Sequence, residues 1–147
     1  MRPWGAVLRV LDSVTEGVHH PAGAVLVTGS HGGLSAGRYA LQSRPLLVVF
    51  NDAGIGKDGA GIASLALLQA QGIAACAVSH DSARIGEAAS TLEHGVLSCA
   101  NEAAQALGAR PGLGLKAWLA HSHSAAAGPT PAGATTAPAS APSPARR

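Results

Sequence analysis

The hydrophobic residues in the first 80 positions of the chain gather in four short runs, at residues 6–12, 24–28, 46–50 and 73–78. The last three runs are apolar throughout, which is typical of strands buried on both faces of a parallel sheet. The first run, AVLRVLD, alternates weakly between apolar and polar positions and is consistent with another strand. Each run is too short for a buried helix, so we predict strands at these places.

Segments with helical features separate and follow these runs. Within residues 59–72, Ile62, Leu65 and Leu68 recur at helical spacing, and Gly72 suits the position just past a helix end. Asp81 or Ser82 can cap a helix that Gly95 closes, and Ser98 can cap the next one. Helices are predicted over residues 34–43, 59–72, 81–95 and 98–108, a short helix or turn over 12–18, and a final strand or packed segment over 114–120.

The alternation of strands and helices predicts an α/β fold. Strand–helix repeats of this length favour parallel strands covered by helices on both faces. We therefore expect a three-layer sandwich with a mostly parallel sheet of four to five strands. From residue 124 onward the chain has no acid, no aromatic residue and no Leu, Ile, Val, Phe or Met. That composition cannot form a core, so residues 1–120 are predicted to be a single domain and 121–147 a disordered Ala/Pro/Ser/Thr-rich tail.

The distribution of charge argues against nucleic acid as a partner. The whole chain has ten Lys and Arg against eight Asp and Glu, and the excess comes from Arg146 and Arg147 in the tail. A balanced domain lacks the basic patch that nucleic-acid binding requires. No apolar run is long enough to span a membrane, and the N-terminus has no continuous apolar signal segment. The cytoplasm is the expected compartment.

Residues with reactive side chains concentrate where the predicted strands end. Ligands bind open parallel sheets outside the carboxyl ends of the strands, so three loops form the candidate site. The glycines in these loops suit a close approach of the backbone to a ligand. The candidates are Ser30, His31, Gly32 and Gly33 after the second strand; Asn51, Asp52, Gly54, Gly56, Lys57 and Asp58 after the third; and Ser79, His80, Asp81, Ser82 and Arg84 after the fourth.

These side chains suggest acid–base chemistry on a small anionic metabolite, of a hydrolase- or lyase-like kind. His31 would be the acid or base, Asp52 its orienting partner or a second base, and Arg84 with Lys57 would bind the anion. Each residue also has a plain structural interpretation. His31 would be an exposed turn histidine, Asp52 a cap or turn acceptor, Lys57 a solvated cation, Arg84 a partner of Glu87, and the serines helix caps.

Three other interpretations remain open at this stage. Gly54, Gly56 and Gly59 form G-x-G-x-x-G, which would bind a nucleotide or dinucleotide, although Asn51-Asp52-Ala53 separate the strand from the first glycine. The three loops would otherwise serve a non-catalytic ligand-binding module, or an assembly module that forms homo-oligomers through exposed sheet edges. His31, Asp52, His80 and Asp81 could converge on a metal, but spacing across three loops assigns no ligands. The cofactor is therefore unknown.

The order VLVTGSHGG, LLVVFNDAGIG and DGAGIASLALLQAQGIAACAVS resembles the caspase-like fold, especially its CHAT-type members, over residues 23–79. The resemblance implies that His31 is the catalytic histidine and that the nucleophile lies at or beside Ala53. No cysteine occupies that position, and Cys76 lies within the following strand. The expected thiol chemistry therefore has no matching residue in this chain, and a shared fold does not by itself give a function.

Overall fold

The computed structural model describes residues 1–127 of the chain, and side chains through Ser122. Five strands form one sheet: β1 (Leu8–Leu11), β2 (Val25–His31), β3 (Leu47–Asn51), β4 (Ala74–Val78) and β5 (Leu97–Ala100). The α-helices are α1 (Leu34–Ser43), α2 (Ser64–Gln69), α3 (Ala88–His94), α4 (Glu102–Ala106) and α5 (Leu115–Ala127), and the 3-10 helices are η1 (Pro3–Gly5), η2 (Val14–His19) and η3 (Lys57–Ile62).

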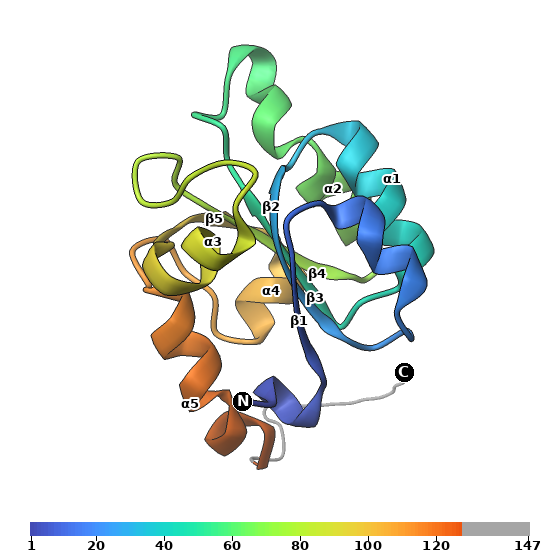
Figure 1. Ribbon diagram of the computed structural model, residues 1–147, viewed down its shortest axis with the longest axis vertical. Helices are drawn as coiled ribbons and strands as arrows, with labels where there is room; N and C mark the ends of the chain where they lie inside the picture. Colours follow the sequence, from blue (N-terminus) through green and yellow to red (C-terminus); the bar gives the residue numbers. More distant parts are fainter. Residues whose placement is uncertain (128–147) are drawn as a thin grey trace.

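The sheet has the strand order β1-β2-β3-β4-β5. The first four strands are parallel, and β5 runs antiparallel to β4. Each connection between parallel strands leads to the adjacent strand on the same side, so the sheet grows in one direction from β1 to β4. Because such crossovers are right-handed, η2, α1 and α2 are expected on the same face of the sheet. Figure 1 shows α1 and α2 together on one side, with α3 and α5 on the other, so the predicted three-layer α/β architecture is confirmed.

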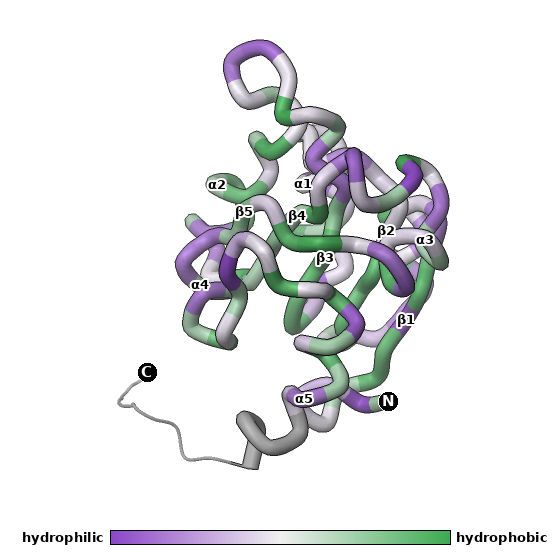
Figure 2. Tube along the Cα trace, turned by 90° about the vertical axis from the view of Figure 1, so that its left-hand side faces the viewer, coloured by the Kyte–Doolittle hydropathy of each residue, from purple (hydrophilic) through white to green (hydrophobic). Residues whose placement is uncertain are grey.

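Alternating side chains of the central strands build a separate core on each face. Val48 and Phe50 pack with α1 and α2, whereas Leu47 and Val49 pack with α4 and α5. All four of these side chains are fully buried, which explains why the strand sequence is apolar at every position. Figure 2 shows the same pattern, with the hydrophobic strands inside and the hydrophilic residues mainly in the loops.

Two predicted helices begin later than expected, because the residues predicted to start them form a loop in one case and the edge strand β5 in the other. Residues 81–87 form a loop, in which Gly86 has a φ of 85° and donates a hydrogen bond to the carbonyl of Gly29 at 2.7 Å. Residues 97–100 form β5, so Ser98 lies in a strand and does not cap a helix. Asn101 caps α4 instead, through a hydrogen bond from the Ala104 amide to its side chain.

The remaining differences concern helix ends. The helix expected over residues 59–72 is observed as η3 followed by the short helix α2, and Asp58 and Gly59 at the start of η3 have left-handed backbone angles. Residues 115–120, where a final strand or packed segment was expected, belong to α5, and Gly114 before them forms an isolated bridge with Val96. That helix packs on η1, with the rings of Trp4 and Trp118 5.3 Å apart. It continues to Ala127, beyond the residue where the tail was expected to begin, and the rest of the predicted tail lies outside the described residues. Among residues 1–127, no helix is sufficiently long and apolar to cross a membrane.

A buried amide side chain joins β4, α2 and α4. Asn101 is 8% exposed, and its side-chain oxygen accepts from the amides of Ala75 and Ala104. Its side-chain nitrogen donates to the carbonyls of Leu65 and Ile73. All four hydrogen bonds of the amide group are therefore satisfied by backbone groups from separate segments.

We expect Asn101→Asp to lower the free energy of unfolding by about 2–4 kcal/mol, because the carboxylate cannot donate to the two buried carbonyls. Urea denaturation measures this change. Gln105→Ala is the control, since Gln105 lies in α4 and its exposed side chain makes one hydrogen bond, to the carbonyl of Ala100 at the end of β5. A loss below about 0.5 kcal/mol in the Asn101→Asp variant would show that the network is not a stabilising element.

Candidate functional site

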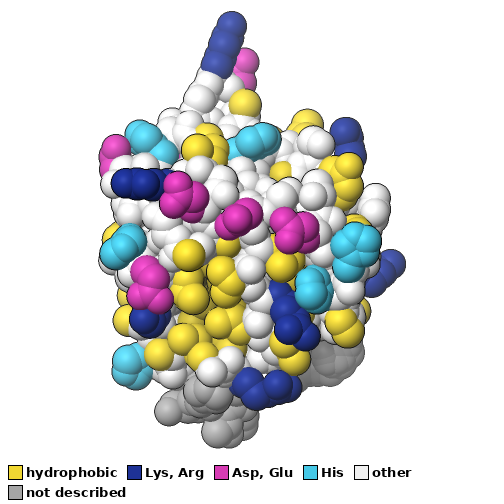
Figure 3. Space-filling view, in the orientation of Figure 1, with side chains coloured by type: hydrophobic (Ala, Val, Ile, Leu, Met, Phe, Trp, Pro, Cys, Tyr) yellow, Lys and Arg dark blue, Asp and Glu magenta, His cyan; other side chains and the backbone are white. Residues whose placement is uncertain are grey.

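A cavity of about 780 Å³ lies where β3 and β4 end. Its walls come from the residues after β3, the loop after β4 and helix α3. Figure 3 shows acidic, basic and histidine side chains together on the upper part of the face drawn there, above a hydrophobic area. The lining residues are Asn51, Ala53, His80, Asp81, Ser82, Ala83, Arg84, Ile85, Glu87, Ser90 and His94.

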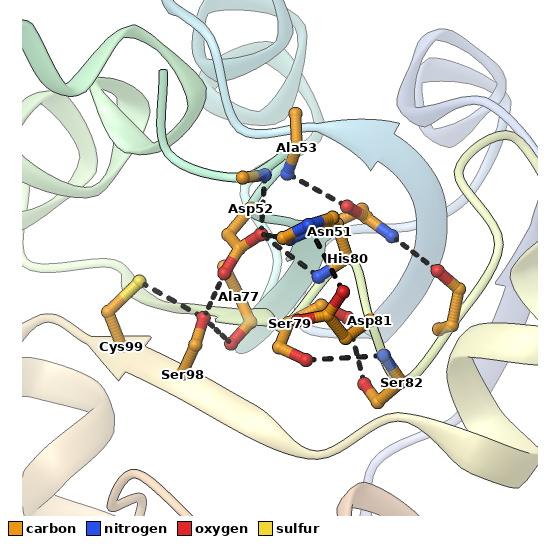
Figure 4. A network of polar contacts seen from close by, with 12 residues as sticks. Asn51, Asp52, Ala53, Ala77, Ser79, His80, Asp81, Ser82, Ser98 and Cys99 are labelled. Atoms are coloured by element: carbon orange, nitrogen blue, oxygen red, sulfur yellow. Dashed lines mark hydrogen bonds and ion pairs between the residues drawn. The ribbon is translucent and has the colours of Figure 1, made fainter. Parts of the chain in front are cut away.

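The carboxylate of Asp52 is buried next to this cavity. It directly follows β3, is 3% exposed, and receives hydrogen bonds from three segments of the chain (Figure 4). Oδ1 accepts from the amides of Gly54 at 2.8 Å and His80 at 3.0 Å. Oδ2 accepts from the Ser98 hydroxyl on β5 at 2.7 Å. The position of the carboxylate is thus fixed by β3, β4 and β5 together.

These contacts keep Asp52 ionised. Burial alone would raise its pKa, but the hydrogen bonds from Ser98, Gly54 and His80, together with the nearby His80 ring, outweigh burial. The pKa of Asp52 therefore lies below its ordinary value of 3.8. The site contains a permanent negative charge at neutral pH.

His80 lies between this buried carboxylate and an exposed one. Its Nδ1 is 3.4 Å from Oδ1 of Asp52, and its Nε2 is 3.2 Å from Oδ1 of Asp81. The His80 side chain is 53% exposed and lines the cavity, so one side of the ring is held by the protein while the other reaches the cavity. Gly54 lies beneath the ring, where an added methyl would come within 3.6 Å of it.

Three of the predicted polar residues form the framework of the cavity. The Asn51 side chain donates to the carbonyl of Ala83 at 3.1 Å and accepts from the amide of Ala53 at 2.8 Å. The Ser79 hydroxyl accepts from the amide of Ser82 at 3.2 Å. The Ser82 hydroxyl donates to the carbonyl of Ser79 and accepts from the amide of Val96. These hydrogen bonds, mostly to backbone groups, fix the shape of the loop after β4.

No hydrogen bond or ion pair joins His31 to Asp52 within the described residues, although the sequence suggests that pair. Its Nδ1 accepts from the amide of Gly33, and its exposed ring lines a separate cavity of about 190 Å³ with Ser30 and Tyr39. Gly32 and Gly33 are buried between this region and η3, where a Cβ on Gly32 would be 2.7 Å from the carbonyl of Gly61. The histidine beside Asp52 is His80, whose signal in the sequence was its position just after a buried strand.

The glycine-rich loop is exposed and projects from the body of the protein at the top of Figure 1. Gly54, Gly56 and Gly59 all have φ between 72° and 75°. Helix α2 begins only after η3, and the first amide of that helix, of Ser64, already donates to the carbonyl of Gly32. Lys57 and Asp58 lie in the exposed loop and are not among the residues that line the large cavity.

Neither cysteine offers a ready thiolate. Burial raises the pKa of Cys76, which lies inside β4. Burial and the negative charge of Asp52 raise the pKa of Cys99. The Ser98 hydroxyl contacts Asp52 directly, so the order is hydroxyl, carboxylate, imidazole. In a nucleophilic triad the imidazole lies in the middle, and this arrangement therefore suits proton transfer by His80 better than attack by Ser98.

Metal ligation finds no support in the described side chains. Within residues 1–122, no three His, Cys, Asp or Glu side chains are grouped so as to hold a metal ion. His31 is separated from the other members of the set considered from the sequence. The remaining members, Asp52, His80 and Asp81, pair with one another as carboxylates flanking an imidazole.

The low pKa of Asp52 predicts how the free energy of unfolding changes as the pH is lowered. A carboxyl group whose pKa is depressed by folding stabilises the protein above about pH 4, and this stabilisation is lost as the pH falls through the folded-state pKa. We expect Asp52→Asn to lower the free energy of unfolding by about 1–2 kcal/mol near pH 7 and by less below pH 4. Urea denaturation at several pH values measures the difference.

Asp58→Asn is the matched control, since Asp58 is exposed and forms no ion pair within the described residues. The Asp58→Asn variant should follow the wild-type pH dependence. A constant gap between wild type and the Asp52→Asn variant from pH 7 to pH 3 would contradict the assigned ionisation.

Comparison with known proteins gives no family. The sequence matches no protein-family model, and neither a curated protein nor a solved structure matches it. The resemblance to the caspase-like fold therefore remains an expectation from the sequence. Because fold alone would not give the activity in any case, the function has to be argued from the side chains of the site.

Proposed function

We propose that this protein is a small-molecule enzyme that performs hydrolase- or lyase-like acid–base chemistry in the cavity at the ends of β3 and β4. The observation that carries the proposal is the pairing of a buried carboxylate, Asp52, with a cavity-lining imidazole, His80. His80 exchanges the proton with the substrate, and Asp52 positions the ring. The substrate is a small molecule that bears an anionic group.

The geometry around Asp52 supports this division of roles. A carboxylate that accepts three hydrogen bonds has little freedom to move, so it holds the ring nitrogen that faces it. Histidine is the side chain best suited to gain and lose a proton near neutral pH. The other ring nitrogen, Nε2, is 3.2 Å from the exposed Asp81 at the cavity, where a substrate would meet it.

Arg84 supports the anionic character of the substrate. Its guanidinium lines the same cavity, is 80% exposed, and lies 3.9 Å from Glu87, which is too far for a hydrogen bond. A guanidinium can bind a carboxylate through two parallel hydrogen bonds. Lys57 does not contribute to this wall, so the anion-binding role suggested by the sequence is proposed for Arg84 alone.

We expect His80→Gln to reduce turnover by about 100-fold or more, and Asp52→Asn by at least about tenfold, with both proteins folded. The reaction is followed by NMR in D₂O with a panel of small carboxylic acids, amides and esters. Product formation reports hydrolysis or elimination, and deuterium at the carbon next to a carbonyl reports proton abstraction.

His31→Gln is the matched control, because His31 lines the other cavity and does not contact Asp52. Its turnover should equal that of the wild type. Full activity in the His80→Gln variant, or loss of activity only in the His31→Gln variant, would overturn the assignment. Binding of a panel member without any conversion would indicate a non-catalytic binding module.

A further inference from the structure

The walls of the large cavity carry two carboxylates and one guanidinium, beside the imidazoles of His80 and His94. Arg84 provides the one guanidinium among its lining residues, whereas Asp81 and Glu87 provide two carboxylates. Asp52 adds a buried negative charge behind His80. A ligand that is only anionic would meet repulsion from these carboxylates as well as attraction from Arg84.

These charges are available to a ligand. The Arg84 and Glu87 side chains are 80% and 57% exposed and stand 3.9 Å apart, and such an exposed pair contributes little internal stability. Asp81 is 86% exposed, and one of its oxygens is 3.2 Å from Nε2 of His80. A ligand that binds between Arg84 and Glu87 therefore breaks only a weak ion pair within the protein.

Opposite charges lie on neighbouring parts of one wall. Arg84 and Glu87 are three residues apart in the loop that precedes α3, and Asp81 lies beside His80 earlier in the same loop. The Ser90 hydroxyl oxygen accepts from the backbone amide of Arg84 at 2.9 Å and lines the cavity, so its hydrogen can point to a ligand oxygen there. The wall thus offers donors for a carboxylate next to acceptors for an ammonium group.

We propose that the ligand of this cavity is a small zwitterion, a compound with both a carboxylate and an ammonium group, such as an α-amino acid. The carboxylate binds Arg84 and the Ser90 hydroxyl. The ammonium group binds Glu87 and Asp81, close to the ring of His80. This inference rests on the proposed function in taking the cavity as the substrate site, and it narrows the substrate class.

The test is an NMR titration of the ¹⁵N-labelled full chain near pH 7 with four probes. Alanine carries both charged groups, propionate lacks the ammonium group, ethylamine lacks the carboxylate, and inorganic phosphate is a plain anion. We expect alanine to shift the amide signals of residues 80–94 and to bind about threefold to tenfold more tightly than each of the other three.

Two variants separate the charged groups. Glu87→Gln should weaken alanine binding and bring its affinity towards that of propionate, because the partner of the ammonium group is lost. Arg84→Gln should bring alanine towards ethylamine. Glu93→Gln is the matched control, since Glu93 lies in α3, pairs with Lys116 at 2.8 Å and does not line the cavity.

Three results would overturn the proposal: propionate or phosphate binding as tightly as alanine, no shift of residues 80–94 with any probe, or an unchanged preference in the Glu87→Gln and Arg84→Gln variants. Failure of the acid–base assignment would look different. In that case alanine would still be preferred by the wild type and by His80→Gln, while the two proteins would show equal turnover.

Discussion

The buried carboxylate of Asp52 is the group on which the arrangement of the site depends. A carboxylate with 3% exposure is tolerated only when its oxygens are hydrogen-bonded, and here the donors come from the β3 loop, the β4 loop and β5. Satisfying this charge therefore holds three segments in one position. The same contacts orient His80 and fix the start of the cavity wall.

The direction of β5 makes this arrangement possible. Parallel strands bring only their carboxyl ends to the edge where Asp52 lies, whereas an antiparallel strand begins there. Leu97 pairs with Val78, the last residue of β4, so Ser98 stands beside the strand ends and reaches Asp52 with its hydroxyl. A fifth parallel strand would have placed its amino end at the opposite edge of the sheet.

The sequence allowed the layers to be predicted but not the contacts within the site. The apolar runs at 46–50 and 73–78 have no polar position, so burial on both faces was predictable from them alone. His31 and His80 each follow such a run, and no local pattern shows which of them reaches Asp52. That choice depends on the loop between β4 and α3, whose path is set by Asn51 and by Gly86 against Gly29. The helical composition of SCANEAAQALG predicts a helix capped by Ser98, and only the pairing with β4 makes the first residues of this segment a strand.

The same carboxylate explains the unusual backbone conformation of the glycine-rich loop. Ala53, Gly54, Ile55 and Gly56 follow one another with φ between 51° and 75°, a conformation that is costly for the branched side chain of Ile55. This path brings the amide of Gly54 onto Asp52 Oδ1 and the amide of Ile55 onto the Asp52 carbonyl at 2.6 Å. Gly61 then packs against that carbonyl, where a side chain would have no room. The glycines therefore allow the backbone to fold around a buried acid, whose carboxylate lies 3.4 Å from the His80 ring.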